Sequence, residues 1–476
     1  MKCWPVGRRV WSPISPCSCE RVFSLVRGLW GPWSVASSTS PRFRFFLVPL
    51  PVTRPKRLIL EVDAMKQIRD RVAGLDVHRD TVVACARVQD PDRSVHVEKS
   101  SFATTRRGLE ELAAFLTEAS VTTVTMEATG VYWKPVFYAL EGLFDELWLC
   151  NAAHVKNVPG RKTDLSDAEW LADVAAHGMV RPSFVPPPDI RELRELTRYR
   201  KTQVEARARE IQRLEKVLQD AGIKLTSVAS AVWSASSRDI IEALIAGQHD
   251  PVVLAQMAKG RMRSKIPALE EALSGHFGSH HALVARQIID HIDFLDSSIS
   301  ALTEGITERL VPFEAAVIIL TSITGVGRTT AEVMIAETGA DMSRFPTAGH
   351  LCAWAGVAPA SYESAGKSRP AGTRRGSPWL RRTLIEAARA GARSKGSYYS
   401  AQYSRIARRR GPNKAAVAVA HSMLETAWHL LTNGTTYEDP GADYFQKRND
   451  PLIEAKRLTR RIEALGFDVT IEPTAA

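Results

Sequence analysis

Four carboxylates in the first third of the chain have the types and positions that could hold a divalent metal ion. Asp76 lies inside a short apolar run, and Glu127 lies near the end of a β-branched run. A carboxylate in such a place is costly to bury unless it is paired or binds a metal. Asp164 and Asp167 stand at the start of an expected helix and share one of its faces. Together the four acids predict a site for Mg²⁺ or Mn²⁺, which prefer oxygen ligands.

Each acid also has an ordinary structural interpretation. Asp164 could be the N-cap of the helix, Asp167 a first-turn acid that complements the helix dipole, and Glu127 a charge at a strand end. Taken singly, these interpretations are the better ones. They explain the set of four less well than a metal does, because Asp76 lies inside a strand.

A basic stretch in the C-terminal part of the chain could bind phosphate groups. Between Gly366 and Lys414 there are fourteen Lys/Arg residues and one acid, Glu386. An exposed helix face normally mixes both signs of charge, so this bias predicts a nucleic-acid surface. The side chains expected to contact DNA within it are Lys367, Arg369, Arg374, Arg375, Arg381 and Arg382.

A glycine turn precedes the basic stretch. Gly325-Val326-Gly327 lies between two expected helices and has the form of a helix-hairpin-helix motif. The backbone N–H groups at such a helix start can hold a DNA phosphate without reading sequence. A Gly-x-Gly turn alone is a weak signal, because any pair of helices can use one, but the apolar residues Ile323 and Ala331 fit the motif.

The elements that must position these residues form two classes of structure. From Met65 to residue 150 the pattern predicts strand, strand, strand, helix, strand, helix, strand, which gives a mixed sheet with helices packed on it. The rest of the chain has helical spacing, so the fold class is α/β followed by all-α. The expected parts are an unstructured head at 1–64, a sheet domain at 65–185, a helical region at 186–312, a second functional domain at 313–435 and a tail at 436–476.

Two long helices are expected in the middle, at 191–221 and 281–310. Apolar residues at steps of three and four make the second resemble the seam of a coiled coil. The two helices could form an antiparallel pair within one chain, or they could be an oligomerisation arm. The sequence supports both interpretations equally.

Composition and charge narrow the class of protein. The chain has 476 residues, a net charge of +11 and six Cys, which excludes a disulfide scaffold. No apolar run reaches the about 18 residues of a membrane-spanning helix, so an integral membrane protein is excluded. Residues 1–64 hold ten Lys/Arg and three acids and show no helical or strand period. We therefore expect this head to lie outside the fold, with Met65 as an alternative start of translation.

Three motifs around the acids resemble those of a known family. They are Gly-Leu-Asp-Val-His around Asp76, Met-Glu-Ala-Thr-Gly around Glu127, and Lys-Thr-Asp-Leu-Ser-Asp-Ala around Asp164 and Asp167. The chain is thereby similar to the DEDD transposases of insertion sequences, whose N-terminal domain is RuvC-like and of the RNase H type. The resemblance covers roughly 68–435.

The same resemblance extends to the C-terminal part and singles out one serine. Segments 323–327 and 356–384 resemble the family's transposase domain, and in Glu-Ser-Ala-Gly-Lys the nucleophilic serine of the family falls on Ser364. The residues alone leave the choice open, because a serine hydroxyl needs activation and no His/Asp motif is near. The rival serines in the same loop are Ser361, Ser368 and Ser377.

The resemblance implies an RNA-guided DNA recombinase of the bacterial cytoplasm, associated with the nucleoid. The acids would hold Mg²⁺, the serine would attack the scissile phosphate, and a phosphoserine link would conserve the bond energy for rejoining. The implied partners are the DNA of the element ends and target, a non-coding guide RNA, and further copies of the chain in a dimer and then a tetramer. Two alternatives are a RuvC-like junction endonuclease in which Ser364 is idle, and a non-catalytic nucleic-acid-binding protein derived from a transposase.

Overall fold

The computed structural model describes residues 67–128, 130–152, 155, 166–360, 362–364, 366–369, 371–447 and 451–470. Two of the predicted features, the head at 1–64 and the acid Asp164, lie outside these residues. In the described part of the chain, none of the helices is long and apolar enough to cross a membrane.

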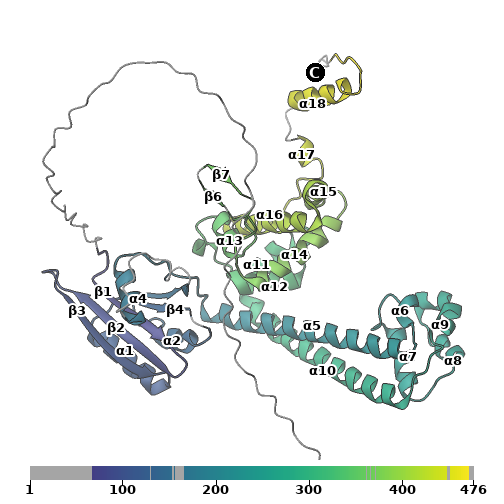
Figure 1. Cartoon of the computed structure of the whole chain (residues 1–476), viewed down its shortest axis with the longest axis horizontal. Coiled ribbons are helices and arrows are strands. Elements are labelled where there is room, and N and C mark those ends of the chain that lie inside the picture. Colours follow the sequence, from purple (N-terminus) through teal and green to yellow (C-terminus); the bar gives the residue numbers. More distant parts are fainter. Residues whose placement is uncertain are drawn as a thin grey trace, which may run out of the picture. The chain divides into compact units, whose positions relative to one another are not determined.

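The described chain begins with a mixed five-stranded sheet, which confirms the prediction (Figure 1). The strand order is β3-β2-β1-β4-β5, with antiparallel pairing from β3 to β1 and parallel pairing from β1 to β5. The strands are β1 (Arg71–Val77), β2 (Thr81–Gln89), β3 (Val95–Ala103), β4 (Thr123–Glu127) and β5 (Glu146–Cys150).

The two faces of β1 pack against different helices. Leu75 and its neighbours two residues away belong to the core shared with α1 (Arg106–Glu118) and α2 (Trp133–Leu140). Val72 packs on the opposite face, against α4 (Asp167–Ala176). Successive side chains of a strand point to opposite faces, so Val72, Gly74 and Asp76 all point toward the α4 side.

The middle of the chain is an antiparallel pair of long helices, α5 (Pro188–Asp220) and α10 (Ser279–Leu310). Glu192 at the start of α5 pairs with Arg309 at the end of α10, with 3.2 Å between them. Asp220 at the end of α5 lies 3.1 Å from His281 at the start of α10. A core of its own joins this end of the pair to shorter elements, which are α6 (Leu225–Val228), α7 (Ala235–Ile245), α8 (Pro251–Gln256), η1 (Gly260–Lys265) and α9 (Ile266–Ala272).

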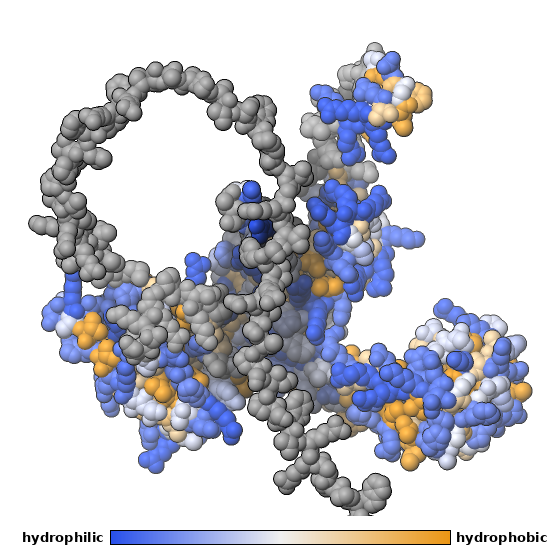
Figure 2. Space-filling model, viewed as in Figure 1, coloured by the Kyte–Doolittle hydropathy of each residue, from blue (hydrophilic) through white to orange (hydrophobic). Residues whose placement is uncertain are grey.

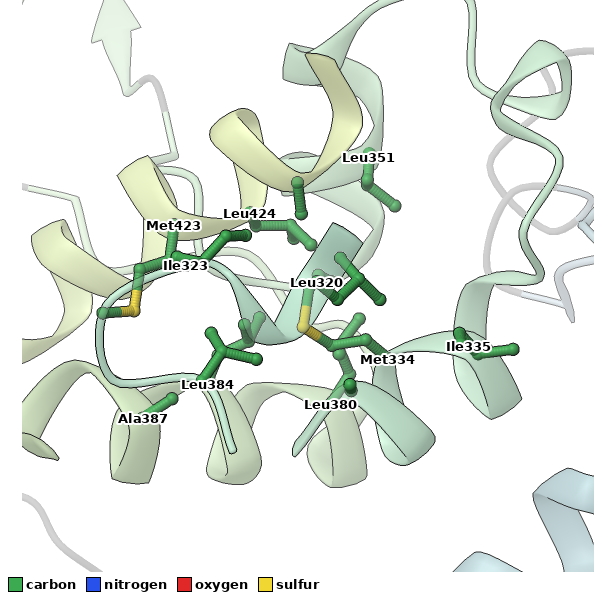
Figure 3. Close-up of a cluster of buried hydrophobic side chains, with 14 of the residues drawn as sticks. Leu320, Ile323, Met334, Ile335, Leu351, Leu380, Leu384, Ala387, Met423 and Leu424 are labelled. Carbon is green, nitrogen blue, oxygen red and sulfur yellow. The ribbon is translucent and has the colours of Figure 1, made fainter. Parts of the chain in front are cut away.

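A second helical core follows, and Figure 3 shows how its apolar side chains converge. Leu320 and Met334 point into it from helices on either side of the glycine turn, and Leu384 and Leu424 meet them from later helices. The elements are η2 (Val311–Phe313), α11 (Glu314–Thr321), α12 (Arg328–Thr338), η3 (Met342–Arg344), α13 (Ala348–Trp354), β6 (Glu363–Ser364), β7 (Lys367–Ser368), α14 (Pro378–Arg393), α15 (Tyr398–Arg410), α16 (Pro412–Asn433), α17 (Tyr444–Lys447) and α18 (Pro451–Glu463).

Candidate active site

Two of the predicted acids share one face and one end of the sheet. In the parallel pairing of β1 with β4, Gly74 is opposite Thr125 and Leu75 is opposite Met126. One step further along, Asp76 comes beside Glu127, on the face that Gly74 and Thr125 share. Both side chains are half-buried. The carboxyl ends of two neighbouring parallel strands therefore bring two carboxylates side by side.

Helix α4 adds a third acid from above this face. Ala176 at its C-terminal end accepts hydrogen bonds from the backbone just before β1. Its N-terminal end, where Asp167 is the first residue, therefore lies over the end of β1 that carries Asp76. The hydroxyl of Ser166 caps the helix by accepting from the N–H of Glu169 at 3.4 Å. The helix start thus places the backbone of Asp167 at the end of the sheet that carries the two strand-end acids.

Gly74 sets the distance between α4 and the sheet. A Cβ atom on this residue would lie 2.0 Å from the carbonyl oxygen of Ala168 and 2.5 Å from the backbone nitrogen of Ala172. Only hydrogen fits in that gap, because backbone atoms cannot move aside as a flexible side chain can. The helix therefore lies directly on the strand that carries Asp76.

We expect Gly74→Ala to lower the stability of the sheet domain by about 1–3 kcal/mol, because overpacking must push α4 away. The fall in the urea midpoint, followed by hydrogen exchange of α4, measures it. Gly349→Ala is the matched control, since a Cβ there would meet its nearest neighbour, the Thr347 hydroxyl, at 3.6 Å. An unchanged midpoint in Gly74→Ala would contradict the close approach.

The chemistry of these donors suits a hard cation. Carboxylate oxygens are the ligands that Mg²⁺ and Mn²⁺ prefer, and three of the four predicted acids come from elements that meet at one end of the sheet. Asp76 also lies 3.2 Å from the Nε2 atom of the exposed His78. The structure thus places Asp76 and Glu127 on neighbouring strand ends and Asp167 at the start of the helix that packs on the same face, while Asp164 lies outside the described residues.

A different group of possible ligands lies at the far end of the helical pair. Within the described ranges, the ligand atoms of Asp220, His280 and His281 lie within 4.8 Å of one another. The Nδ1 atom of His281 accepts the N–H of Gly278 at 3.1 Å, so the other nitrogen of its ring donates to Asp220. This arrangement caps the start of α10. Both ring nitrogens of His281 are engaged in hydrogen bonds, so neither is free to bind a metal.

Two buried thiols near the acids stay protonated. Burial raises the pKa of Cys85 to about 11, and the nearby charge of Glu169 adds to the effect. Burial likewise raises the pKa of Cys150 to about 12, with a contribution from Glu127. A thiol binds a metal as the thiolate, so neither cysteine competes with the carboxylates as a ligand at neutral pH.

The serine that the resemblance singles out lies in a short hairpin. Ser364 in β6 pairs with Lys367 in β7, and Gly366 lies in the turn between them. Gly366 in this turn has φ +72°, a left-handed conformation that suits glycine. The side chains of Lys367 and Arg369 are exposed on the same hairpin. The fold therefore places cationic side chains within a few residues of the Ser364 backbone.

One rival serine has a structural task. The Ser377 hydroxyl accepts the N–H of Leu380 at the start of α14 and donates to Glu337 at 3.0 Å. A hydroxyl committed to both a helix cap and a buried carboxylate is a poor nucleophile. Ser361 lies outside the described residues.

The glycine turn is explained by packing. Gly325 has φ +94°, and a Cβ atom on it would lie 2.5 Å from the backbone nitrogen of Gly391 in α14. Glycine is therefore required at position 325, both by the left-handed conformation of the turn and by the close approach of α14. Gly327 is the N-cap of α12 and has open space around its Cα. A DNA phosphate at this helix start remains a prediction.

The basic stretch forms an exposed cationic surface. Thirteen of its fourteen Lys/Arg side chains are exposed, the exception being the half-buried Arg381, and Figure 2 shows hydrophilic residues over α15. Among the described residues, one acid lies within 4 Å of these side chains. It is Glu205, whose carboxylate is 3.8 Å from Arg382. Cations that lack acidic partners are available to phosphate groups.

DNA affinity should therefore fall steeply with salt, by about 10³-fold between 50 and 200 mM if six phosphates are contacted. Arg408→Gln with Arg409→Gln should lower the slope of log K against log salt by up to about two. The matched control is Arg106→Gln with Arg107→Gln, because these exposed arginines each pair with an acid one helical turn away. A slope near zero in the unmodified protein, measured by fluorescence anisotropy, would contradict the surface.

Sequence reasoning missed an ion-pair network around a buried carboxylate, which joins α5 to the helical domain that carries the Ser364 hairpin. Glu337 of α12 is fully buried and accepts two hydrogen bonds from Arg198 of α5, at 2.7 and 2.8 Å. Arg194 donates to the Glu337 carbonyl oxygen at 2.6 Å, and burial lowers the pKa of Arg194 to about 10. Helical spacing alone could not show that these charges face each other across 139 residues of sequence.

Comparisons with known proteins match both functional regions. The DEDD transposase model of the IS110 group, described as a transposase, matches residues 73–223. The model described as transposase IS116/IS110/IS902 family matches residues 318–404. The first range contains the four predicted acids, and the second contains the hairpin of Ser364.

Individual relatives agree with these matches. The transposase for insertion sequence element IS1111A of Coxiella burnetii is 24% identical over 397 residues, which cover 81% of this chain and 96% of that protein. The insertion element IS110 uncharacterized 43.6 kDa protein of Streptomyces coelicolor is 32% identical over 151 residues, or 30% of this chain and 34% of that protein. A putative transposase of Sinorhizobium fredii is 31% identical over 123 residues, or 25% of this chain and 32% of that protein.

Proposed function

Because this chain belongs to the IS110/IS116 family of DEDD transposases, we propose that it cuts and rejoins DNA strands at the ends of its insertion sequence through the hydroxyl of Ser364. The observation that supports the proposal is the pairing of β1 with β4, whose ends carry Asp76 and Glu127, with Asp167 at the start of the helix that packs on that face. Carboxylate oxygens in such a place suit metal-assisted phosphoryl transfer.

The residues that would hold Mg²⁺ or Mn²⁺ are Asp76, Glu127, Asp164 and Asp167, and the chemistry that such an ion supplies is neutralisation of the charge on the reacting phosphate. The protein's own part is to fix the carboxylates. Glu127 is held by the end of β4, and Asp167 by a capped helix that rests on Gly74. Fixed ligands reduce the reorganisation needed when DNA binds.

The serine chemistry conserves the energy of the phosphodiester bond, because a phosphoserine link replaces the bond that breaks. The Ser364 oxygen forms a bond to phosphorus and loses its proton, and the bond from phosphorus to the departing deoxyribose oxygen breaks, with that oxygen taking up a proton. Attack by a hydroxyl of another strand reverses the exchange and frees the serine. Lys367, Arg374 and Arg375 would stabilise the negative charge of the transition state, and Arg369, Arg381 and Arg382 would hold neighbouring phosphates.

Choice of target and assembly complete the proposal. A guide RNA would select the target DNA, and its phosphates suit the exposed cations of α15. Two and then four copies of the chain would hold the two DNA partners, and the α5–α10 pair is a candidate for the contact between copies. The reaction would take place at the nucleoid in the bacterial cytoplasm.

Asp76→Asn tests the proposed site. We expect strand cleavage with Mg²⁺ to fall on the order of 100-fold or more, because loss of one ligand's charge weakens metal binding. DNA affinity should stay within about twofold. The readout is single-turnover cleavage of a labelled duplex with the element's end, in the presence of its RNA.

The matched control is Asp80→Asn, since this aspartate lies four residues away and its side chain is 80% exposed. Full cleavage by Asp76→Asn would support a non-catalytic nucleic-acid-binding protein. Loss of DNA affinity together with cleavage would show that the acids are structural.

A further inference from the structure

A cavity lies beside the hairpin that carries Ser364. Its volume is about 760 Å³, within the range of small-molecule sites. Part of its wall is the backbone at 371–373, which begins a few residues after the hairpin. Helices α14, α15 and α16 supply the rest of the lining, with Val357, Val417 and Ala418 as apolar surface. An apolar cavity of this size suits a flat ring system.

One buried polar atom in the lining lacks a partner. Gln402 of α15 is 8% exposed, and its Nε2 atom donates to the Ser422 hydroxyl at 2.8 Å. Its Oε1 atom is buried and has no hydrogen-bond partner. An unpaired buried carbonyl of this kind costs about 1–3 kcal/mol, which a hydrogen bond from a bound molecule would recover. Gln402 lines the cavity, so a rotation of its amide would bring this oxygen to an N–H donor of a bound ring.

The rim of the cavity is cationic. Lys414 is exposed there and has no acidic partner among the described residues. The guanidinium of Arg381 donates to the Thr373 hydroxyl at 2.6 Å, which fixes it at the wall. His421 faces Glu425, with 3.3 Å from its Nδ1 atom to the carboxylate. An apolar interior, one buried acceptor and a cationic rim match the parts of a nucleotide.

We propose that this cavity receives one unpaired nucleobase of a strand whose phosphates lie on the cationic surface. The Watson–Crick edge of every base has an N–H group that can donate to the Gln402 oxygen. The faces of the ring would pack against Val417 and Ala418, and the adjoining phosphate would pair with Lys414. The proposal rests on the proposed function, because it needs a nucleic acid at the Ser364 hairpin. Its consequence is that a base close to the reacting phosphodiester leaves the stack.

The test compares two single strands of equal charge. Hexadeoxyadenylate and a hexamer with abasic tetrahydrofuran units in place of all bases have the same number of phosphates. By fluorescence anisotropy, the unmodified protein should bind the first about tenfold more tightly, because stacking and one hydrogen bond are lost with the bases. Hexariboadenylate, run beside them, tells whether the base comes from DNA or from RNA.

Two variants test whether the difference in affinity between the two hexamers arises at this cavity. Gln402→Met keeps the length of the side chain without its carbonyl and should reduce the tenfold ratio to about threefold. Ala418→Phe puts a ring where the base would pack and should bring the ratio close to one. Neither should change the affinity for the abasic hexamer by more than about twofold. Ala407→Phe is the matched control, since Ala407 is also half-buried on a helix but does not line the cavity.

Two results would overturn the proposal. One is equal binding of both hexamers by the unmodified protein. The other is an unchanged ratio in both cavity variants when their melting temperatures match that of the unmodified protein. These results do not bear on the proposed function. That function is tested by strand cleavage in Asp76→Asn, and not by the ratio of the two affinities.

Discussion

Ser364→Ala is expected to remove the covalent protein–DNA adduct and to reduce strand cleavage on the order of 10⁴-fold or more. The reason is chemical: without the hydroxyl, no atom of the hairpin can form the bond to phosphorus. DNA affinity should change by less than about twofold, because the cations of the surface remain. The adduct is measured by trapping the reaction in denaturant and following labelled DNA that migrates with the protein.

Ser368→Ala is the matched control, since this serine lies in the paired strand of the same hairpin. It should form the adduct at a normal level. Cleavage that survives in Ser364→Ala without any adduct would favour the metal-dependent junction endonuclease instead. Loss of the adduct in Ser368→Ala alone would assign the nucleophile to the other strand.

Glu337→Gln is expected to destabilise the helical core around α12 by about 3–5 kcal/mol, because it removes the buried carboxylate charge that partners the largely buried Arg194 and the partly exposed Arg198. Arg198 would lose a bidentate ion pair, and the Ser377 hydroxyl would lose the charged acceptor that it now has at the start of α14. The urea midpoint measures the loss, and hydrogen exchange of α12 locates it. The second measurement is needed because a long chain with several cores does not unfold in one step.

Glu386→Gln is the matched control. Glu386 of α14 also pairs with α5, through Lys201 at 3.1 Å, but its side chain is 62% exposed. An exposed pair of this kind contributes about 1 kcal/mol or less, so the urea midpoint should barely move. Equal shifts in both variants would show that burial of the Glu337 network has no special effect.

The sequence predicted the order of strands and helices in the sheet domain, because strands and helices there differ clearly in apolar period. The long helices were predicted within a few residues. Their pairing within one chain could not be predicted, because an apolar seam fits a helix of the same chain and a helix of another copy equally well.

Of the candidate site, the sequence singled out four acids but not what holds them in place. Asp76 stood out because an acid inside an apolar run is unusual. Gly74 did not stand out, since glycine in a strand has many possible reasons, and only the position of α4 shows which applies. Gln402 and Glu337 were missed for a similar reason: their importance depends on burial and on partners that are distant in sequence.

The close approach of α4 to β1 at Gly74 is made by backbone atoms, which every amino acid has in common. How far α4 stands from β1 is therefore independent of side-chain rotamers and of the identity of most residues in that helix. Side chains along α4 can therefore change during evolution while the main chain keeps the distance between the end of β1 with Asp76 and the start of α4 with Asp167. That distance holds for as long as a hydrogen atom remains the only substituent at one α-carbon.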